Sequence, residues 1–578
     1  MNKFKIFGII LLATFATSKA QEIDQVKKVI DAEQFEKAKG ILKSLIQTKP
    51  NNGKAYFLLG NIYLTQKIAD SAKIYFQKGL TVSEDSKYNY IGLGQIDLDD
   101  NNLISAQNNF NLATKDAKKK EVEPFIFVAK AYMNADKPDY TAALNNLNKA
   151  KTNNPSDSQL LLTLGDAYYG DKKQNESYVS YRDAFAADPT LIRAKMQLGV
   201  LLKGARAFTE AVKALYDVVD VDKNYGPVYR ELAETYYLWA INSGVNNKSG
   251  DVIISEDRGQ IKTTFVPNYS NCINKALGYY ETYMKLTDYS LTSRMRHADF
   301  LVLTKDYKAL EMEANKMKEL DKVNPRIFRY LGYSSYENGN TDSAISALET
   351  FISTPTNKII ARDYMYLGLA KLRKANNLET KTFDQGVFDS GVSNLKKAVE
   401  IEITMTNDLS EIGKKFYEQK LFKQAAAIYE IAVTNVNSKN YVLDNFYLGN
   451  SLYYNNTKKD VVKPNPEELQ KADVAFGNVI TASPTTQDAY IFRARANNLL
   501  ENDEMIIKYY QQYIDVVTEK GAEELAKPAV RTKFIESYNA IAAAFANTDK
   551  VKAKEYFNKT LTLDATNEYA TQSLKQLK

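Results

Sequence analysis

The sequence predicts an all-α solenoid in which pairs of helices repeat along the chain. Leu-Gly dipeptides recur 34 residues apart, first at 59–60 and 93–94 and then at 164–165 and 198–199. Between these copies, apolar and small residues follow spacings of three and four, which place them on one face of a helix. A period of this length indicates units that stack on their neighbours, so one long array accounts for a chain of 578 residues.

The unit that begins near Gly53 shows the pattern most clearly. Gly60 lies on the apolar face of the first expected helix, and after a polar turn at 66–67 the residues Ala72 and Phe76 continue the spacing on a second helix. Because Gly60 and Ala72 are small, we expect the two helices to approach closely, with Phe76 filling the space beside them.

This pattern of an aromatic residue, Leu-Gly, Tyr, a small residue and Phe, at a 34-residue period, resembles the tetratricopeptide repeat. The resemblance covers nearly all of the chain after residue 20. It implies a right-handed α-solenoid of about fourteen helix–turn–helix units, in which the first helix of each hairpin lines a concave groove. It also implies that the protein works by binding other proteins.

The units are divided into arrays by interruptions of the period. We expect a first array at 21–288 with an insert at 241–270, and a second array at 289–565 with inserts at 376–390 and 455–467. Within the first insert, β-prone runs at 252–254 and 261–266 flank a glycine, which predicts a small β-hairpin. The last stretch, 566–578, is predicted to be a capping helix with Tyr569, Leu574 and Leu577 on one side.

The N-terminus has the three parts of a cleavable signal peptide. Lys3 and Lys5 are followed by an uncharged, mostly apolar run at 6–16 and by the small residues Ser18 and Ala20. We expect cleavage after Ala20 and export to the periplasm. Position 21 is not cysteine, so the sequence favours a soluble exported protein over a lipoprotein.

The composition argues against metal-dependent or nucleophilic catalysis. The chain has one histidine, His297, and one cysteine, Cys272, too few for a His-based catalytic pair or a multi-His metal site. We therefore expect no catalytic residues, no cofactor and no metal. The formal charge of +6 falls by three when Lys3, Lys5 and Lys19 are removed with the signal, which gives no reason to expect nucleic acid.

The groove supplies the candidate binding residues. Arg and Tyr are enriched in binding hot spots, and the middle of the array carries several on helices expected to face inward. The candidates are Arg193, Arg230, Arg326, Arg329, Tyr333, Tyr336, Arg362, Phe446, Asn450 and Tyr453. The alternative is that groove residues of this kind only support the adjacent hairpins.

These observations favour a non-catalytic periplasmic scaffold that organises a cell-envelope complex. Its expected partners are envelope or outer-membrane proteins, with membrane association only through a partner. The alternative is a chaperone-like carrier of extended client polypeptides during export or outer-membrane assembly. An enzyme is the third alternative, and no motif supports it.

Overall fold

The computed structural model describes residues 21–577, except 119, 244–251, 258–259, 266–268, 289, 322–323, 378–379, 381 and 460. The predicted signal peptide therefore lies outside the described residues. Contacts divide the chain into two compact units, Met1–Ala309 and Leu310–Lys578, called unit 1 and unit 2 below. The sequence placed the division between the arrays at 288/289.

Unit 1 is almost entirely helical where it is described. A helix at residues 21–31 comes first. The elements that follow are α2 (Phe35–Thr48), α3 (Gly53–Thr65), α4 (Ala69–Leu80), α5 (Lys87–Asp99), α6 (Leu103–Thr114), α7 (Glu123–Asn134), α8 (Tyr140–Asn153), α9 (Ser158–Gly170), α10 (Gln174–Ala187), α11 (Ile192–Gly204), α12 (Phe208–Val221), α13 (Gly226–Ser243), β1 (Val252–Asp257), β2 (Gln260–Phe265), α14 (Tyr269–Leu286) and α15 (Leu291–Thr304).

Unit 2 continues the same alternation of helices. Helix α16 (Tyr307–Leu320) spans the division between the units. After it come α17 (Pro325–Glu337), α18 (Thr341–Ser353), α19 (Ala361–Lys374), β3 (Asn376–Asn377), β4 (Thr382–Phe383), α20 (Gln385–Ile401), α21 (Met405–Glu418), α22 (Phe422–Ala432), α23 (Tyr441–Asn456), α24 (Pro466–Ala482), α25 (Gln487–Leu499), α26 (Asp503–Glu519), α27 (Ala522–Leu525), α28 (Pro528–Phe545), α29 (Lys550–Leu563) and α30 (Glu568–Gln576).

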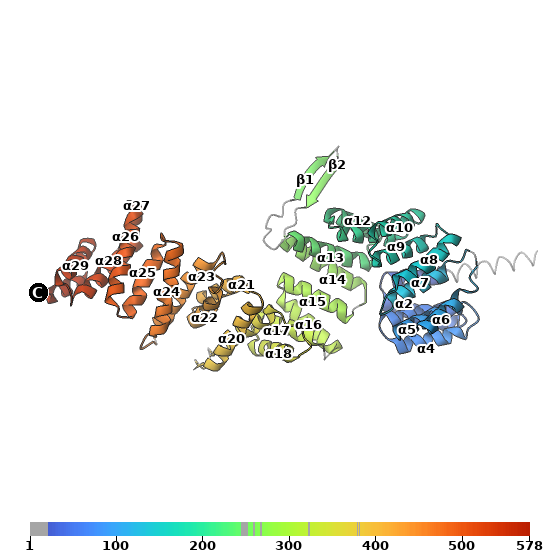
Figure 1. The fold of residues 1–578 in the computed structure, drawn as a ribbon, viewed down its shortest axis with the longest axis horizontal. Coiled ribbons are helices and arrows are strands. Elements are labelled where there is room, and N and C mark those ends of the chain that lie inside the picture. Colours follow the sequence, from blue (N-terminus) through green and yellow to red (C-terminus); the bar gives the residue numbers. More distant parts are fainter. Residues whose placement is uncertain are drawn as a thin grey trace, which may run out of the picture. The chain divides into compact units, whose positions relative to one another are not determined.

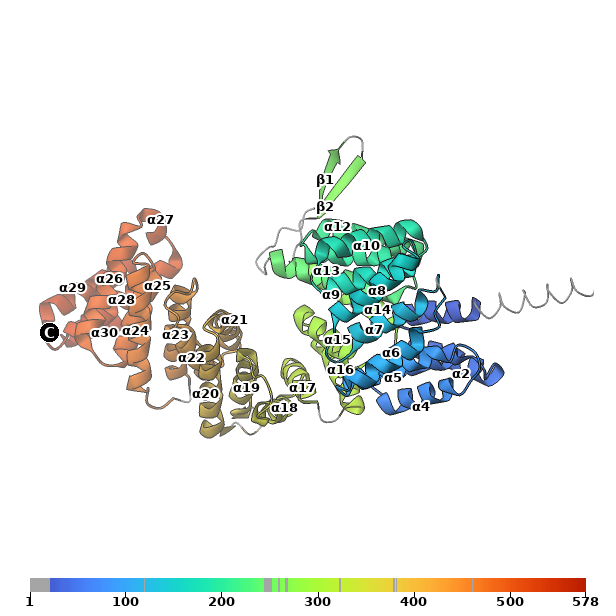
Figure 2. The same cartoon turned by 45° about the vertical axis from the view of Figure 1, so that its right-hand side comes forward.

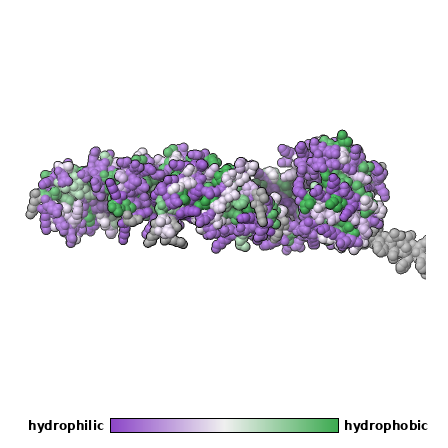
Figure 3. Space-filling model, turned by 90° about the horizontal axis from the view of Figure 1, so that it is seen from below, coloured by the Kyte–Doolittle hydropathy of each residue, from purple (hydrophilic) through white to green (hydrophobic). Residues whose placement is uncertain are grey.

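The predicted all-α solenoid of helical hairpins is confirmed. Consecutive helices pair as hairpins, such as α3 with α4 and α5 with α6 in unit 1, or α17 with α18 and α19 with α20 in unit 2. The first helices of neighbouring hairpins also touch, as α3 does α5 and α17 does α19. Figures 1 and 2 show these pairs stacked side by side within each unit. In Figure 3, hydrophilic residues cover most of the face in view, and hydrophobic ones form scattered patches.

A left-handed residue closes many of the hairpins. Lys67, Asn101, Lys172 and Arg206 all have φ near +60° at the turn from a first to a second helix, and Gly339 has φ of +90° at the corresponding turn of α17–α18. Only the last is glycine, the residue that adopts this region without a steric cost. The turn geometry is therefore set by the packing of the two helices rather than by the local sequence.

The core of the first repeats is built around Phe76. Its ring is fully buried between two glycines, Gly60 on α3 and Gly92 on α5. A Cβ atom at either glycine would lie 2.3 Å from the ring. The close approach expected at Gly60 is thus present, and the same aromatic ring also joins one hairpin to the next.

Replacement by alanine should have opposite effects on stability at Gly92 of α5 and at Gly40 of α2. Gly92→Ala should destabilise unit 1 by about 1–3 kcal/mol, because the new methyl group overlaps a buried ring that has glycine on both sides. Gly40→Ala in α2 is the control, since no atom lies within 4 Å of its Cβ position. It should stabilise the helix by up to about 1 kcal/mol through propensity alone. Thermal unfolding of both variants measures whether each change raises or lowers the stability. A Gly92→Ala variant that is more stable than the native chain would contradict this packing.

The interruptions take different forms. The predicted hairpin is present: β1 and β2 pair antiparallel, with Val252 opposite Phe265 and Asp257 opposite Gln260. In the second insert, β3 and β4 pair over two residues each, and α20 already begins at Gln385, inside the predicted range 376–390. The third lies between the end of α23 at Asn456 and the start of α24 at Pro466.

The capping helix is present as α30, but its buried side differs from the expected one. Ala570 and Leu577 are buried against α28 and α29, with Leu574 packed beside them. Tyr569 is 54% exposed and touches the cluster only through the edge of Phe557, at 5.9 Å between ring centroids. Ala570, one residue further on, is fully buried instead.

Candidate protein-binding site

The two candidate arginines of unit 1 are already engaged by carboxylates of the same chain. Arg193, on α11, donates to Asp166 at 2.8 Å and lies 3.8 Å from Asp31. Arg230, on α13, donates to both carboxylate oxygens of Glu33, at 2.6 and 2.9 Å. Each arginine therefore faces an acid that comes from the N-terminal end of the chain.

Asp31 and Glu33 are positioned by the helix at 21–31. Val26 of this helix is fully buried and Ile23 is 7% exposed, both within the core formed by the hairpins. Lys27 makes a 2.6 Å ion pair with Glu123 at the start of α7, and Lys54 of α3 makes a second one with the same carboxylate. Burial raises the pKa of Glu123, but the two lysines outweigh it and lower that pKa to about 2. The N-terminal helix thus lies against the first helices of several hairpins.

In unit 2, Arg329 is part of a buried ion pair. It donates from two nitrogens to the two oxygens of Asp363, at 2.8 Å each, and Asp363 is fully buried. The Tyr333 hydroxyl donates to the same carboxylate at 2.7 Å. Arg329 and Tyr333 therefore connect α17 to α19.

The remaining candidates near α17 have different surroundings. Arg326 donates to the Tyr330 hydroxyl at 3.0 Å. Tyr336 is buried beneath the guanidinium of Arg373, which lies 4.1 Å from its ring centroid. Arg362 is half-buried, and no carboxylate of the described residues forms an ion pair with it.

The three candidates on α23 belong to an aromatic cluster further along unit 2. Phe446 and Tyr453 both pack edge-on against Phe492 of α25, at 6.4 and 5.6 Å between centroids. Asn450 lies one turn away from each, is 3% exposed, and its side-chain oxygen has no hydrogen-bond partner among the described residues. The structure brings these three together, as it does Arg329 with Tyr333, but the candidates as a whole are spread over both units.

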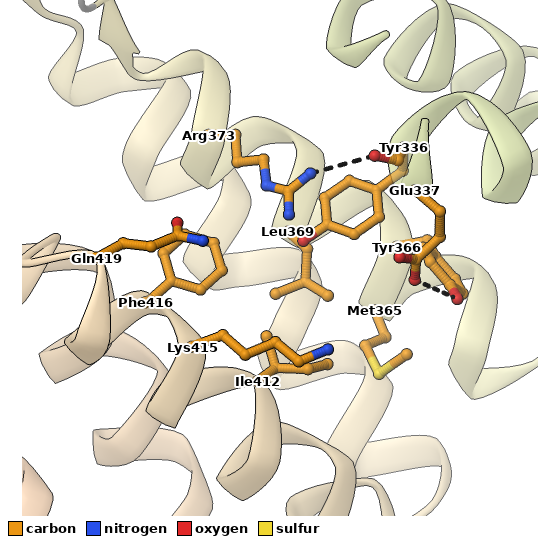
Figure 4. Close-up of a pocket in the computed structure, with 10 residues that line it drawn as sticks. All are labelled: Tyr336, Glu337, Met365, Tyr366, Leu369, Arg373, Ile412, Lys415, Phe416 and Gln419. Atoms are coloured by element: carbon orange, nitrogen blue, oxygen red, sulfur yellow. Dashed lines mark hydrogen bonds between the residues drawn. The ribbon is translucent and has the colours of Figure 1, made fainter. Parts of the chain in front are cut away.

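A hollow lies across three successive first helices of unit 2. We call it the unit 2 hollow. It is lined by Tyr336, Glu337, Met365, Tyr366, Leu369, Arg373, Ile412, Lys415, Phe416 and Gln419. These residues come from α17, α19 and α21, and Figure 4 shows Arg373 and Lys415 on either side of Leu369.

The hollow combines an apolar floor with two cations. Leu369, Met365 and Phe416 are buried. Arg373 is held in place by donating to the Tyr336 carbonyl oxygen at 3.1 Å, and the Tyr366 hydroxyl donates to Glu337 at 3.0 Å. Lys415 is exposed and makes no ion pair with a described residue.

Of the residues that line the hollow, the sequence singled out Tyr336 as a candidate site and missed the cations Arg373 and Lys415. The signal for them was present, because Met365, Leu369 and Arg373 follow each other at spacings of four on α19, and Ile412, Lys415 and Phe416 share one face of α21.

The described residues offer little for catalysis. No group of three or more His, Cys, Asp or Glu among them could hold a metal ion. Cys272 is buried, which raises the pKa of its thiol to about 11 and keeps it protonated at neutral pH. His297 lies 3.7 Å from the Glu281 carboxylate. Of the helices in the described part of the chain, none is long and apolar enough to cross a membrane.

Comparison with known proteins gives one family and several structural similarities. The family model described as the tetratricopeptide repeat matches residues 53–86, which is the hairpin α3–α4 and the turn that follows it. No curated protein gives a significant match.

Similar solved structures include the C-terminal part of a repeat-containing protein from Cytophaga hutchinsonii, with 27% identity over 48% of this chain and 98% of that one, at a TM-score of 0.29. A tetratricopeptide repeat protein from Parabacteroides merdae matches with 11% identity over 49% and 98%, at 0.30. The pilF protein of Pseudomonas aeruginosa matches with 15% identity over 47% and 93%, at 0.25. TM-scores this low carry no inference about function.

The fold and the hollow define a class: a helical-hairpin solenoid that presents surfaces to other proteins. The matched repeat is followed by further hairpins that repeat its packing along both units. Residues 53–86 therefore form a tetratricopeptide repeat, and repeats of this kind in general serve as non-catalytic scaffolds for protein–protein interaction.

Proposed function

We propose that this protein is a periplasmic scaffold that holds partners of a cell-envelope complex, and that the unit 2 hollow is its main partner-binding surface. The observation that carries the proposal is Lys415, which makes no ion pair with a described residue, beside the apolar lining of the hollow. An exposed cation of this kind is available to a partner, whereas Arg193 and Arg230 of unit 1 are already paired with carboxylates.

The chemistry of the hollow suits a segment with one large apolar side chain and a nearby carboxylate. The apolar side chain would cover Ile412, which is partly exposed in the lining, and the carboxylate would pair with Lys415. Burial raises the pKa of Tyr336 to about 12, with Arg373 opposing the rise, so its hydroxyl stays neutral and adds no competing negative charge.

Localisation is tested by the fate of residues 1–20. The mature protein should begin at Gln21 and should be released from cells by osmotic shock. The positive start, the apolar run and the small residues before Gln21 support this expectation. N-terminal sequencing of the released protein measures it. A protein that keeps residues 1–20 and stays with the cytoplasmic fraction would contradict the proposal.

The partner surface is tested by photo-crosslinking in intact cells. A photoreactive amino acid at Gln419, which is exposed and lines the hollow, should give a small set of discrete adducts. The same amino acid at Lys396, an exposed position of α20 outside the hollow, is the matched control and should not give them. Adding Lys415→Glu to the Gln419 probe should reduce the adducts at least fivefold, while the circular dichroism of the purified protein stays unchanged.

The pattern of adducts separates the scaffold from the carrier. One or a few partners that recur between growth conditions support the scaffold. A broad smear of unfolded clients would favour the chaperone-like carrier. Equal adducts at Gln419 and Lys396 would mean that the hollow is not the binding surface.

A further inference from the structure

The helix at residues 21–31 is held to unit 1 by ion pairs as well as by apolar contacts. Lys27 pairs with Glu123 of α7, Asp31 faces Arg193 of α11, and Glu33, just after the helix, pairs with Arg230 of α13. Glu33 also accepts a 2.7 Å hydrogen bond from the Tyr283 hydroxyl of α14. The segment therefore contacts four helices, which belong to three hairpins, and Figure 2 shows the dark-blue helix running beside α7 and α14.

The apolar part of this contact is small. Ile23 and Val26 are the buried apolar side chains of the helix, and Val29 and Ile30 are partly buried. The other positions are polar or charged. Each ion pair of the segment is partly exposed to solvent, which limits what it adds to the apolar contact.

The helix also lies at the end of the array. In the mature chain proposed above, which begins at Gln21, it is joined to the array through the turn before α2, so it can leave without separating the hairpins from α3 to α14. Terminal elements of this kind open more readily than the repeats they cover.

Its departure would expose a site with a defined chemistry. Arg230 would lose its closest carboxylate, Glu33, and keep only Glu231 at 3.4 Å, while Arg193 would keep Asp166. Beside these arginines, the surface that Ile23 and Val26 cover would become exposed to solvent. A ligand that fits has two aliphatic side chains three residues apart on one helical face, followed by two carboxylates.

We propose that helix 21–31 is an exchangeable internal ligand of unit 1, and that an amphipathic helix of a protein partner, with the same pair of aliphatic residues and the same terminal acids, binds in its place. The covering helix serves as the template for the partner. This surface belongs to unit 1, so it is independent of the partner surface proposed on unit 2.

Because it is tethered, the internal helix has an advantage over a free ligand for the same site. A tethered segment faces its site at an effective concentration in the millimolar range. A free helix at micromolar concentration therefore fails to displace it from the native protein, and binding becomes visible when the internal helix is weakened.

The test uses the full mature chain and a fluorescent peptide of residues 21–35. Asp31→Arg with Glu33→Arg should release the internal helix by repulsion from Arg193 and Arg230. The peptide, followed by fluorescence anisotropy, should bind this variant at least tenfold more tightly than the native chain. Asp70→Arg with Asp116→Arg is the control: it makes the same change in charge at exposed positions outside the helix at 21–31, and should behave like the native chain. A peptide with both acids changed to arginine should not bind.

Hydrogen exchange of the native chain gives an independent measurement that needs no variant. Residues 21–31 should exchange at least tenfold faster than α9–α13, and faster still at high salt, because their anchoring pairs are screened. Equal exchange rates, or a double variant that loses protection throughout α9–α13, would show that the helix is an integral part of the fold and would overturn the proposal. So would a variant that frees residues 21–31 but does not bind the peptide. If the native chain dimerises by exchanging this helix, the occupant of the site is a second copy of the chain. That result would overturn the assignment to a different partner.

Discussion

Replacing Arg329 with alanine should destabilise unit 2 by about 3–5 kcal/mol, the cost of leaving a buried charge without its partner. Asp363 is fully buried, and Arg329 itself is only 16% exposed. Besides the two bonds from Arg329, the carboxylate accepts one from the Tyr333 hydroxyl and one from the backbone N–H of Ile360. Removing the guanidinium leaves two neutral donors to hold a full negative charge.

Chemical denaturation of the native and variant chains measures this loss. Arg362→Ala is the matched control: Arg362 lies next to Asp363 on the same helix and forms no ion pair with a described carboxylate, so the change should stay within about 0.5 kcal/mol. Combining Arg329→Met with Asp363→Asn removes both charges and should recover most of the loss. A single Arg329→Ala variant as stable as the control would show that the pair contributes nothing.

The same contacts change how the candidate residues are interpreted. The sequence predicted an arginine-rich strip that attracts acidic partner segments. Arg193, Arg230 and Arg329 instead hold acids of the chain itself, so a variant such as Arg329→Glu would disturb folding as well as binding. Arg362 is the candidate arginine whose substitution would report on binding with the least effect on stability.

Short-range periodicity predicted the helices and their packing because the fold repeats. Gly60 and Phe76 lie sixteen residues apart in one hairpin, and their contact follows from small and large residues on facing helices. The ion pairs were predictable in the same way, since Arg329 and Asp363 are separated by 34 residues, as are Lys87 and Glu121. Equivalent positions of adjacent first helices face each other, so a charge and its opposite one period apart indicate a pair.

The packing partners of the N-terminal helix could not be predicted from the 34-residue period. Glu33 and Arg230 are 197 residues apart, and no period relates them. Their contact depends on how the stacked hairpins curve, which accumulates from small rotations at every interface. The sequence of 21–31 shows only a short amphipathic helix, without the partner it packs against.

The second large effect concerns Asp444, a buried carboxylate on α23. It is fully buried; one oxygen accepts a 2.5 Å hydrogen bond from the Ser410 hydroxyl of α21, and the other has no hydrogen-bond partner among the described residues. Burial raises the pKa of Asp444 from 3.8 to about 6, and the bond from Ser410 opposes the rise. The folded state therefore holds the proton more tightly than the unfolded state does.

The sign of the pH dependence follows from this difference. Below about pH 4 the carboxyl is protonated in both states and has no effect. As the pH rises from about 4 to 6, the unfolded chain ionises first and is stabilised, so the free energy of unfolding falls. At neutral pH the accumulated loss is about 3 kcal/mol for a shift of about two pKa units.

Asp444→Asn should remove this dependence, because the amide does not titrate. The difference in unfolding free energy between Asp444→Asn and the native chain should shift in favour of the variant between pH 4 and pH 6, by about 3 kcal/mol, and stay constant above that range. Taking the difference cancels the titration of other groups. Ser410→Ala removes the hydrogen bond that lowers the pKa of Asp444, so in this background the same transition should move to higher pH. A difference that is flat with pH would mean that the pKa of Asp444 is the same in the folded and unfolded chains, and one that turns against the variant as the pH rises would mean that folding lowers this pKa.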